Sequence, residues 1–269
     1  MGLLKEMPAL ALDQAQLAHW GQVWLGTAGS PTKPKKKGDA PVPKMKAANC
    51  FDKKQGMDFG MVFDSAYGAA LAEMLGNSVA KPLDNSLLPP APDVVEVGKT
   101  RVVGGIRPQN YDAAYRPDGP RVVYDSKTLN DASSIRKNWQ NMINDLATEA
   151  STVHTRFPYC IVNFIIALPR PALQHAQEQA LIRTLERLGS RDDELDQHHL
   201  AEAISLVIWN PEDGSIDQQS PPTSSGLRLE TMHERIYSAY QDRYRNLPPH
   251  EIEEATDAAE PNDDGSGVI

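Results

Sequence analysis

The segment from Tyr159 to Leu168 constrains the fold more than any other, because it is almost entirely apolar (YCIVNFIIAL) and is followed at once by Pro169. A strand with apolar side chains on both faces must be covered by other layers on both sides. Such strands are typical of the centre of a sheet that carries helices on its faces. The segment therefore predicts an α/β domain built around a buried sheet.

The segments before this strand alternate between helical and extended patterns. Residues 58–75 carry apolar side chains on one broad helical face and end at Gly76, a typical helix stop. Three strands and a second helix are predicted after it, at 94–106, 111–115, 121–129 and 130–151. The order is helix, three strands, helix, strand, for which the simplest fold is a mixed central sheet flanked by helices.

The two ends of the chain are expected to add to this core. Residues 1–50 should form short N-terminal helices followed by a linker or mobile loop rich in Lys and Pro at 27–43. The core with its additions is expected over 51–210, and a C-terminal helix over 211–248. Residues 249–269 are expected to be a disordered acidic tail.

The net charge of -9 argues at first against a nucleic-acid partner, because phosphate binding draws on Lys and Arg. Residues 247–269, however, hold seven acids and no Lys or Arg, which leaves 29 acids against 27 bases elsewhere. Residues 33–54 hold eight lysines against two aspartates. This cationic stretch is either an arm that contacts nucleic acid or a solvated linker, and its composition leaves both open.

Membrane and nucleotide-driven functions are not expected. No run approaches the roughly 20 apolar residues that a membrane helix needs, and Glu6 and Asp13 interrupt the apolar pattern at the start of the chain. The chain also has no P-loop, no GxGxxG after a strand and no GxSxG element. We expect a cytoplasmic protein without membrane contact.

Two acidic residues face each other across the hairpin formed by the second and third strands. If its turn is centred between residues 118 and 119, the numbers of opposed residues sum to 237, which pairs Asp112 with Asp125. Opposed side chains have Cβ atoms about 4.5 to 5.5 Å apart on one face of the sheet. Lys127 follows Asp125 by two residues and is expected on the same face.

Two carboxylates held this close repel each other unless a cation or a proton lies between them. Mg²⁺ prefers a few carboxylates, a carbonyl and several waters, which Asp112, Asp125 and the backbone carbonyl of Ser126 would supply. Ser126 itself is expected to point away from the pair. An ammonium such as that of Lys127 can orient or help deprotonate an attacking water and offset charge on a phosphodiester. The group predicts a phosphodiesterase that uses Mg²⁺ or Mn²⁺, and the alternative is a solvated hairpin without chemistry.

The pattern Asp112-x12-Asp125-Ser126-Lys127, on a hairpin between two helices, resembles the PD-(D/E)xK nuclease superfamily. That superfamily includes restriction endonucleases and exonuclease domains similar to that of the RecB repair helicase. The element order predicted over 58–168 is similar to its core. The resemblance implies a restriction-endonuclease-like αβββαβ core, metal ligation by Asp112 and Asp125, and Lys127 as the catalytic lysine.

The resemblance also implies roles for two residues on the helices. Glu73 on the first helix would be an additional metal ligand, and Gln140 on the second would contact DNA, as a glutamine does in RecB-like members. Asp118, in a literal Pro-Asp pair, is the second choice for the first acidic ligand. It lies about 10 Å along the strand from Asp125 at 3.3 Å per residue, so Asp112 is preferred.

The expected function is Mg²⁺-dependent cleavage of DNA by a restriction or phage-defence endonuclease. The alternatives are a RecB-like exonuclease or repair nuclease, and a non-catalytic nucleic-acid-binding or protein-binding module with the same fold. Because cutting both strands of a duplex takes two sites, a homodimer is a natural expectation. A methyltransferase, an ATPase or a helicase would be the expected partner protein.

Overall fold

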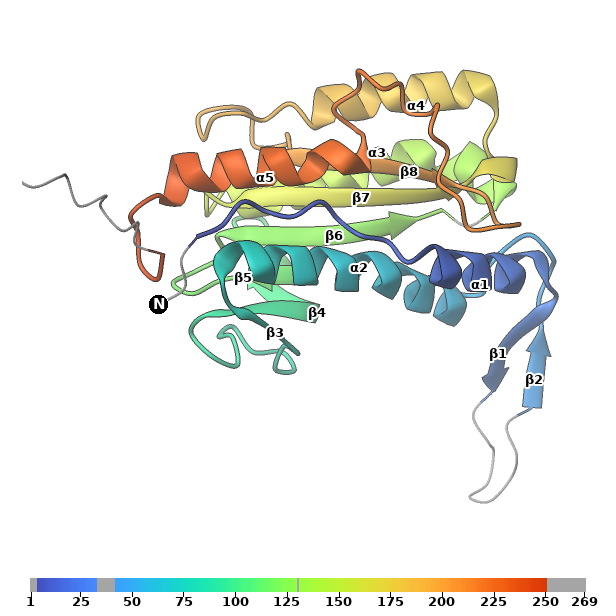
Figure 1. Ribbon diagram of the computed structural model, residues 1–269, viewed down its shortest axis with the longest axis horizontal. Helices are drawn as coiled ribbons and strands as arrows, with labels where there is room; N and C mark the ends of the chain where they lie inside the picture. Colours follow the sequence, from blue (N-terminus) through green and yellow to red (C-terminus); the bar gives the residue numbers. More distant parts are fainter. Residues whose placement is uncertain (1–3, 33–41, 130, 251–269) are drawn as a thin grey trace, which may run out of the picture.

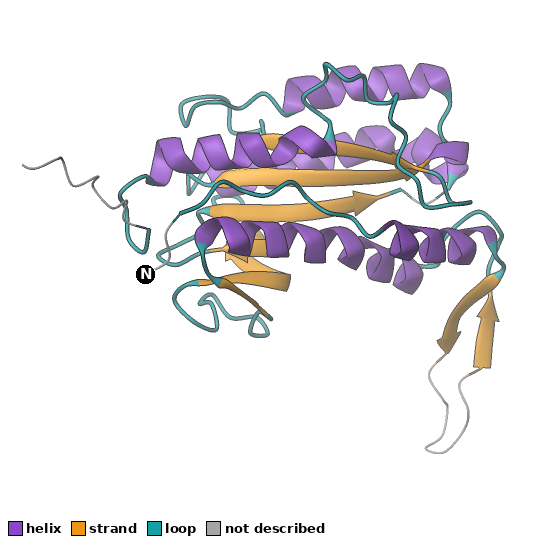
Figure 2. Cartoon of the chain, viewed as in Figure 1, coloured by secondary structure: helices purple, strands orange, loops and turns teal. Residues whose placement is uncertain are grey.

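The computed structural model describes residues 4–32, 42–129 and 131–250, which we call the described chain. In the described chain, six strands form one mixed sheet, and helices cover both of its faces (Figures 1 and 2). The α/β architecture predicted from the sequence is confirmed at this level. The predicted acidic tail, apart from residues 249 and 250, lies outside the described chain.

The described helices are α1 Gln14–Leu25, α2 Lys53–Leu75, α3 Ala132–His154, α4 His175–Leu188 and α5 Leu229–Tyr244, with one 3-10 turn, η1, at Arg170–Ala172. The strands of the main sheet are β3 Ser78–Ala80, β4 Val94–Val103, β5 Pro108–Tyr115, β6 Val122–Thr128, β7 Ile161–Pro169 and β8 Ala203–Trp209. From α2 to β7 the order, apart from the short β3, is the predicted helix, three strands, helix, strand.

The main sheet changes direction at β6. Its strand order is β3-β4-β5-β6-β7-β8. The β4–β5 and β5–β6 pairs are antiparallel, whereas the β6–β7 and β7–β8 pairs and the short β3–β4 pair are parallel. Helix α3 makes the crossover from β6 to β7, as a parallel pair requires. Every residue of β7 is buried, which confirms the interior position predicted for this strand.

Two apolar layers enclose the sheet. Helices α1, α2 and α5 cover one face, and α3 and α4 cover the other (Figure 1). The first layer includes Leu17 of α1 and Ile236 of α5, so both ends of the described chain belong to the same core. None of the described helices is both long and apolar enough to cross a membrane.

Helix α2 lies directly on the sheet because a stripe of small residues faces it. Gly56, Gly60, Asp64 and Gly68 recur every four residues, a spacing that places them on one side of the helix. A Cβ atom at Gly60 would lie 3.2 Å from the Ser126 Oγ. The close approach carries Asp64, the acidic member of the stripe, against the sheet.

Gly68→Ala is expected to lower the free energy of unfolding by about 1 to 3 kcal/mol through overpacking. A Cβ atom there would lie 2.2 Å from Val97 Cγ2 on β4, which is closer than carbon atoms can pack. Urea denaturation measures the change. Ser65→Ala, an exposed site on the same helix, is the control and should be neutral or slightly stabilising. Equal stability of Gly68→Ala and wild type would contradict this packing.

Part of the segment expected to be a linker is ordered instead. Strand β1 Ala28–Thr32 pairs with β2 Val42–Met45 in a separate antiparallel ribbon that projects from the body (Figure 1). The Asp52 carboxylate holds the base of this ribbon, because it accepts the Ser30 N–H and, at 2.9 Å, the Ser30 hydroxyl. The anchor lies outside the segment, so the composition of the segment did not reveal it. Residues 33–41 of the predicted linker lie outside the described chain.

Candidate active site

The hairpin between β5 and β6 has the predicted register. Its described pairs are Ala113 with Tyr124, Ala114 with Val123 and Tyr115 with Val122. The residue numbers of each pair sum to 237, the sum that pairs Asp112 with Asp125 one step further along, but the paired residues end at Ala113 and Tyr124. The regular ladder ends before this step, where the Ser126 N–H donates to Asp112 Oδ2 at 3.0 Å.

The orientation expected for Ser126 was wrong. We expected this side chain to point away from the carboxylates, but its hydroxyl donates to Asp112 Oδ2 at 3.1 Å. The physical reason is the end of the ladder, because an Asp112 side-chain oxygen replaces the backbone acceptor and so reaches the Ser126 side of β6. Asp112 therefore faces both its predicted neighbour Asp125 and the side chain next to it.

A cavity of about 610 Å³ brings acidic groups from three elements together. It is lined by Asp64 from α2, Asp112 from β5, and Asp125 from β6. Lys53 and Lys99 also line it, and both are exposed. The cavity is thus lined both by carboxyl groups and by exposed ammonium groups, which suits a ligand that contains a cation and an anion.

Asp64 is the acid that the sequence analysis did not select. Its side chain is buried, and its Oδ1 has no hydrogen-bond partner within the described chain. Burial and the neighbouring Asp112 carboxylate together raise the pKa of Asp64 to about 8. Asp64 is thus a buried carboxyl beside a carboxylate, on a residue that lines the cavity and with one oxygen that no described group bonds, which makes it a candidate ligand for a cation.

Lys127 is connected to the three acids of the cavity through Asp125, and it is also bonded to Glu149 of α3, the helix that covers the sheet face opposite to α2. Its Nζ donates to Asp125 Oδ2 and, at 2.9 Å, to Glu149 Oε1 on α3. Gln109 Nε2 donates to the same Glu149 oxygen at 2.9 Å. Burial alone would lower the pKa of Lys127, but the Asp125 and Glu149 carboxylates raise it above its usual range. Lys127 is therefore an ammonium at any physiological pH.

Asp125 experiences opposing influences. Burial raises its pKa, the Lys127 ammonium lowers it, and Asp112 raises it again, so that the net direction is upward. In the structure the Ser126 hydroxyl donates to Asp112 and the Lys127 ammonium donates to Asp125. No group of three or more His, Cys, Asp or Glu side chains in the described ranges is arranged to hold a metal ion.

A second cavity, of about 450 Å³, adjoins the first across β6, and Ser126 and Thr128 line both. Lys127 lines it together with Asn138 and Asn141 from α3. The Lys127 side chain therefore lies between the acidic cavity and a cavity rich in side-chain amides.

The structure does not bring the other predicted residues to this place. Glu73 is exposed and lies nine residues beyond Asp64, about 13 Å along the axis of α2. Gln140 is exposed, and its neighbour Asn141 faces the cavity instead, because adjacent helix residues point in different directions. The Asp118 carboxylate remains in the turn, where Arg121 donates to it at 2.9 and 2.6 Å.

No family model, no curated protein and no solved structure matches this chain. The chemistry of the site is therefore inferred from the cavity and the side chains that line it.

Proposed function

We propose that the chain is a divalent-metal-dependent nuclease that hydrolyses phosphodiester bonds in DNA. The observation that carries the proposal is the meeting of Asp64, Asp112 and Asp125 in one cavity, with the Lys127 ammonium bonded to Asp125. Exposed lysines beside the same cavity support an anionic substrate.

The oxygen donors have the chemistry that a hard divalent cation such as Mg²⁺ or Mn²⁺ prefers. Since no described group of acids is arranged as a metal site, the carboxylates would have to move together to bind the cation. Asp112 and Asp125 would hold it, with the Ser126 carbonyl as a further oxygen and Asp64 in the place first expected for Glu73. The unpartnered Asp64 Oδ1 is the feature of this structure that favours such a ligand. When bound, the cation would supply a Lewis acid for a phosphoryl oxygen and would lower the pKa of a bound water.

Lys127 has an electrostatic role in this proposal. Its raised pKa makes it a poor proton acceptor, so of the two roles considered for it, orienting the attacking water is favoured over deprotonating it. The ammonium also offsets negative charge as the water oxygen bonds to phosphorus and the leaving P–O bond breaks. Glu149 fixes the position of Lys127 from α3.

The fold supports a finer proposal, a restriction-endonuclease-like core of the PD-(D/E)xK type. Helix α2, the antiparallel strands β4 to β6, helix α3 and the parallel strand β7 follow one another in the order typical of that core. The acids lie on the central hairpin and on the preceding helix. A restriction or phage-defence endonuclease and a RecB-like nuclease are both compatible with this arrangement.

The rival function is a nucleic-acid-binding module in which the charged cluster only holds the strands together. The observation that favours it is the set of internal contacts, because Ser126 donates to Asp112 and Lys127 donates to Asp125 and Glu149. In that case the carboxylates would never need a cation.

Cleavage assays separate the two functions. Wild type, Lys127→Ala and Asp125→Ala are incubated with supercoiled plasmid, linear duplex and single-stranded DNA, in Mg²⁺ and in chelator. The proposed nuclease cuts only with metal, and both substitutions abolish cutting. Equal results from the three proteins, or cutting that persists in chelator, would contradict the proposal.

Asp64→Asn is expected to reduce Mg²⁺-dependent cleavage by about 100-fold, because it removes the third acidic group of the cavity. Glu73→Gln is the matched control, since it makes the same kind of change in the acid first expected to bind metal, and it should leave cleavage within about two-fold of wild type. Initial rates at saturating substrate measure both. A large loss of cleavage in Glu73→Gln together with a small loss in Asp64→Asn would indicate that Glu73, and not Asp64, is the metal ligand.

A further inference from the structure

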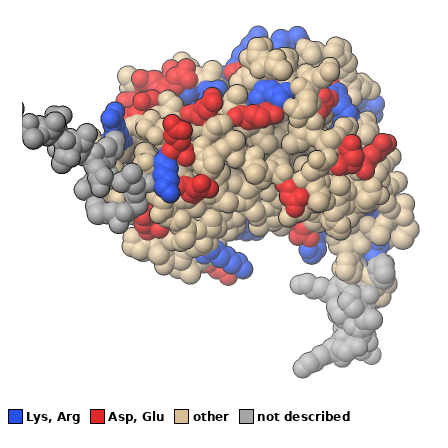
Figure 3. Space-filling model, viewed as in Figure 1, with Lys and Arg blue, Asp and Glu red and all other residues tan. Residues whose placement is uncertain are grey.

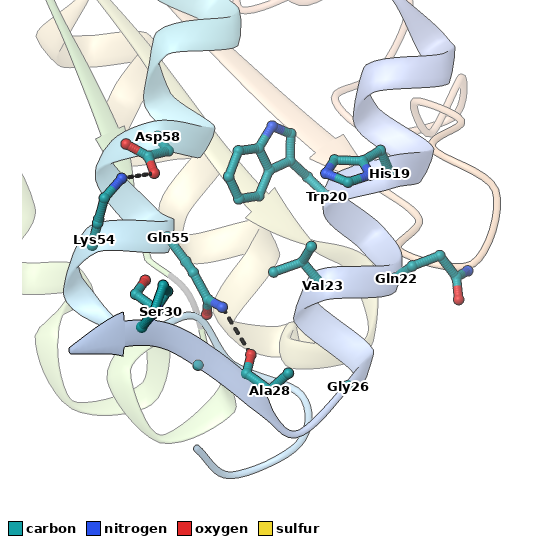
Figure 4. Close-up of a pocket in the computed structure, with 12 residues that line it drawn as sticks. His19, Trp20, Gln22, Val23, Gly26, Ala28, Ser30, Lys54, Gln55 and Asp58 are labelled. Carbon is teal, nitrogen blue, oxygen red and sulfur yellow. Dashed lines mark hydrogen bonds and ion pairs between the residues drawn. The ribbon is translucent and has the colours of Figure 1, made fainter. Parts of the chain in front are cut away.

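A third cavity lies beside the acidic one, between α1, β1 and the start of α2 (Figure 4). Its volume is about 470 Å³. Trp20 and Val23 enter it from α1, and Ala28 lines it from β1. The space is therefore bounded largely by an indole ring, aliphatic groups and backbone.

The Trp20 ring is fixed by other aromatic rings. It meets Phe51 edge-on, with ring centroids 5.9 Å apart, and Phe59 in the same manner at 6.4 Å. His19 makes a further edge contact at 5.6 Å. Trp20 is nevertheless half-buried, and Figure 4 shows it directed from α1 toward α2. A rigid, partly open indole is a suitable platform for a flat ring.

Three polar side chains that line this cavity, Gln55, Ser30 and Lys54, are already engaged. Gln55 Nε2 donates to the Ala28 carbonyl at 2.8 Å, and Lys54 is paired with Asp58 (Figure 4). The Ser30 hydroxyl donates to Asp52. The cavity thus offers mainly apolar contact rather than free hydrogen-bonding groups. This favours a ligand recognised by stacking, with little preference among similar rings.

The cavity is next to the acidic site. Asp58 lines both, and it precedes Asp64 on α2 by six residues, about 9 Å along the helix axis. Lys53 lines the acidic cavity and Lys54 lines the indole cavity. A chain with flat rings and regularly spaced phosphates would place a ring near Trp20 and a phosphate near the acids.

We propose that the Trp20 cavity receives an unpaired nucleobase of the strand being cut, so that the preferred substrate is single-stranded nucleic acid or an unpaired end. This inference rests on the proposed function for the identity of the neighbouring site. In an intact duplex the base faces are stacked on their neighbours and cannot enter such a cavity without unpairing. Stacking on Trp20 makes binding tolerant of base identity.

Binding in chelator tests the proposal without cleavage. Fluorescence anisotropy compares a labelled oligothymidylate with a blunt duplex of the same length, using wild type, Trp20→Ala and Trp20→Phe. Wild type should bind the single strand more tightly than the duplex. Trp20→Ala should weaken single-strand binding by about 10-fold, within the range of one base stacked on an aromatic ring, whereas Trp20→Phe should retain most of the affinity.

A second pair of variants tests the cavity independently, in case Trp20→Ala does not fold. Ala28 is exposed and lines the cavity, so Ala28→Tyr fills it without removing a packed group. Thr27→Tyr adds the same ring at the adjacent exposed position and is the matched control. Ala28→Tyr should weaken single-strand binding as Trp20→Ala does, and Thr27→Tyr should not.

Unchanged single-strand affinity in both Trp20→Ala and Ala28→Tyr would overturn the proposal, as would equal wild-type affinity for the duplex. These failures are distinguishable from failure of the nuclease function. If the protein cuts DNA but its single-strand affinity does not change with substitutions in the Trp20 cavity, the nuclease function stands and the nucleobase site is refuted. If single-strand binding depends on Trp20 but the protein never cuts, the binding site stands and the nuclease function is refuted.

Discussion

Lys127→Ala is expected to lower kcat for DNA cleavage by about 1,000-fold, because it removes the ammonium beside the acidic cavity. The change should leave KM nearly unaltered, since Lys127 lies between Asp125 and Glu149 rather than at the exposed edge of the site. The measurement is the rate of cleavage at saturating substrate in Mg²⁺. Circular dichroism establishes that the variant is folded.

Lys99→Ala is the control for this result. Lys99 also lies at the acidic cavity, but its side chain is exposed, so its removal should raise KM a few-fold and leave kcat unchanged. If both lysine variants changed only KM, Lys127 would be a contact for the substrate and not part of the chemistry.

Glu202→Ala is expected to cause the largest loss of stability, about 3 to 5 kcal/mol, because it leaves buried charges without their partner. Arg191 and Arg243 both donate to Glu202 Oε1, and the Val162 N–H donates to Oε2 at 2.7 Å. His154 Nε2 lies 3.4 Å from the same carboxylate. The carboxylate thereby joins β7, the start of β8 and α5. Urea denaturation at pH 7 measures the loss.

The Glu202 carboxylate is also expected to make the free energy of unfolding fall at low pH. Burial would raise the pKa of Glu202, but His154, Arg243 and Arg191 lower it from 4.5 to about 2. A lowered folded-state pKa means that the stabilisation is complete above about pH 4.5 and is lost as the pH falls toward 2. In Glu202→Gln this part of the acid dependence should be absent. Glu212→Gln, the same change at an exposed acid, should keep the wild-type curve.

The hairpin that carries the site could be predicted because its register depends only on counting from the turn. The ladder follows this register as far as Ala113 and Tyr124. Counting could not reveal that the ladder ends there and that Asp112 then bonds to Ser126. The Ser126 hydroxyl also lies against α2, where a Cβ atom at Gly60 would be 3.2 Å from it, and counting along the hairpin does not reveal this contact with a distant element.

Asp64 was missed because helical periodicity defines faces but not which face meets a distant hairpin. Helix α2 is buried over much of its surface, so its apolar pattern did not single out one side. A signal was present in the four-residue spacing of Gly56, Gly60 and Gly68, because small residues on one stripe indicate a close contact. An acid on that stripe is a better candidate than Glu73.

Glu149 and the β1–β2 ribbon were missed for different reasons. Glu149 continues the apolar stripe of α3 that includes Met142 and Leu146, and an acid on a buried stripe indicates a buried partner. The ribbon has the composition of a linker and is held by Asp52, a contact that no local pattern predicts. Local patterns thus defined the elements, whereas contacts between elements completed the site.

Anomalous diffraction from crystals soaked in Mn²⁺ would reveal whether the Asp64, Asp112 and Asp125 carboxylates hold a divalent cation. We expect an anomalous peak in the acidic cavity, about 2.1 Å from oxygens of Asp112 and Asp125, and its loss in Asp125→Ala crystals. A cavity without a peak at saturating Mn²⁺, in a protein that still cuts DNA with the metal, would mean that these carboxylates do not hold the metal.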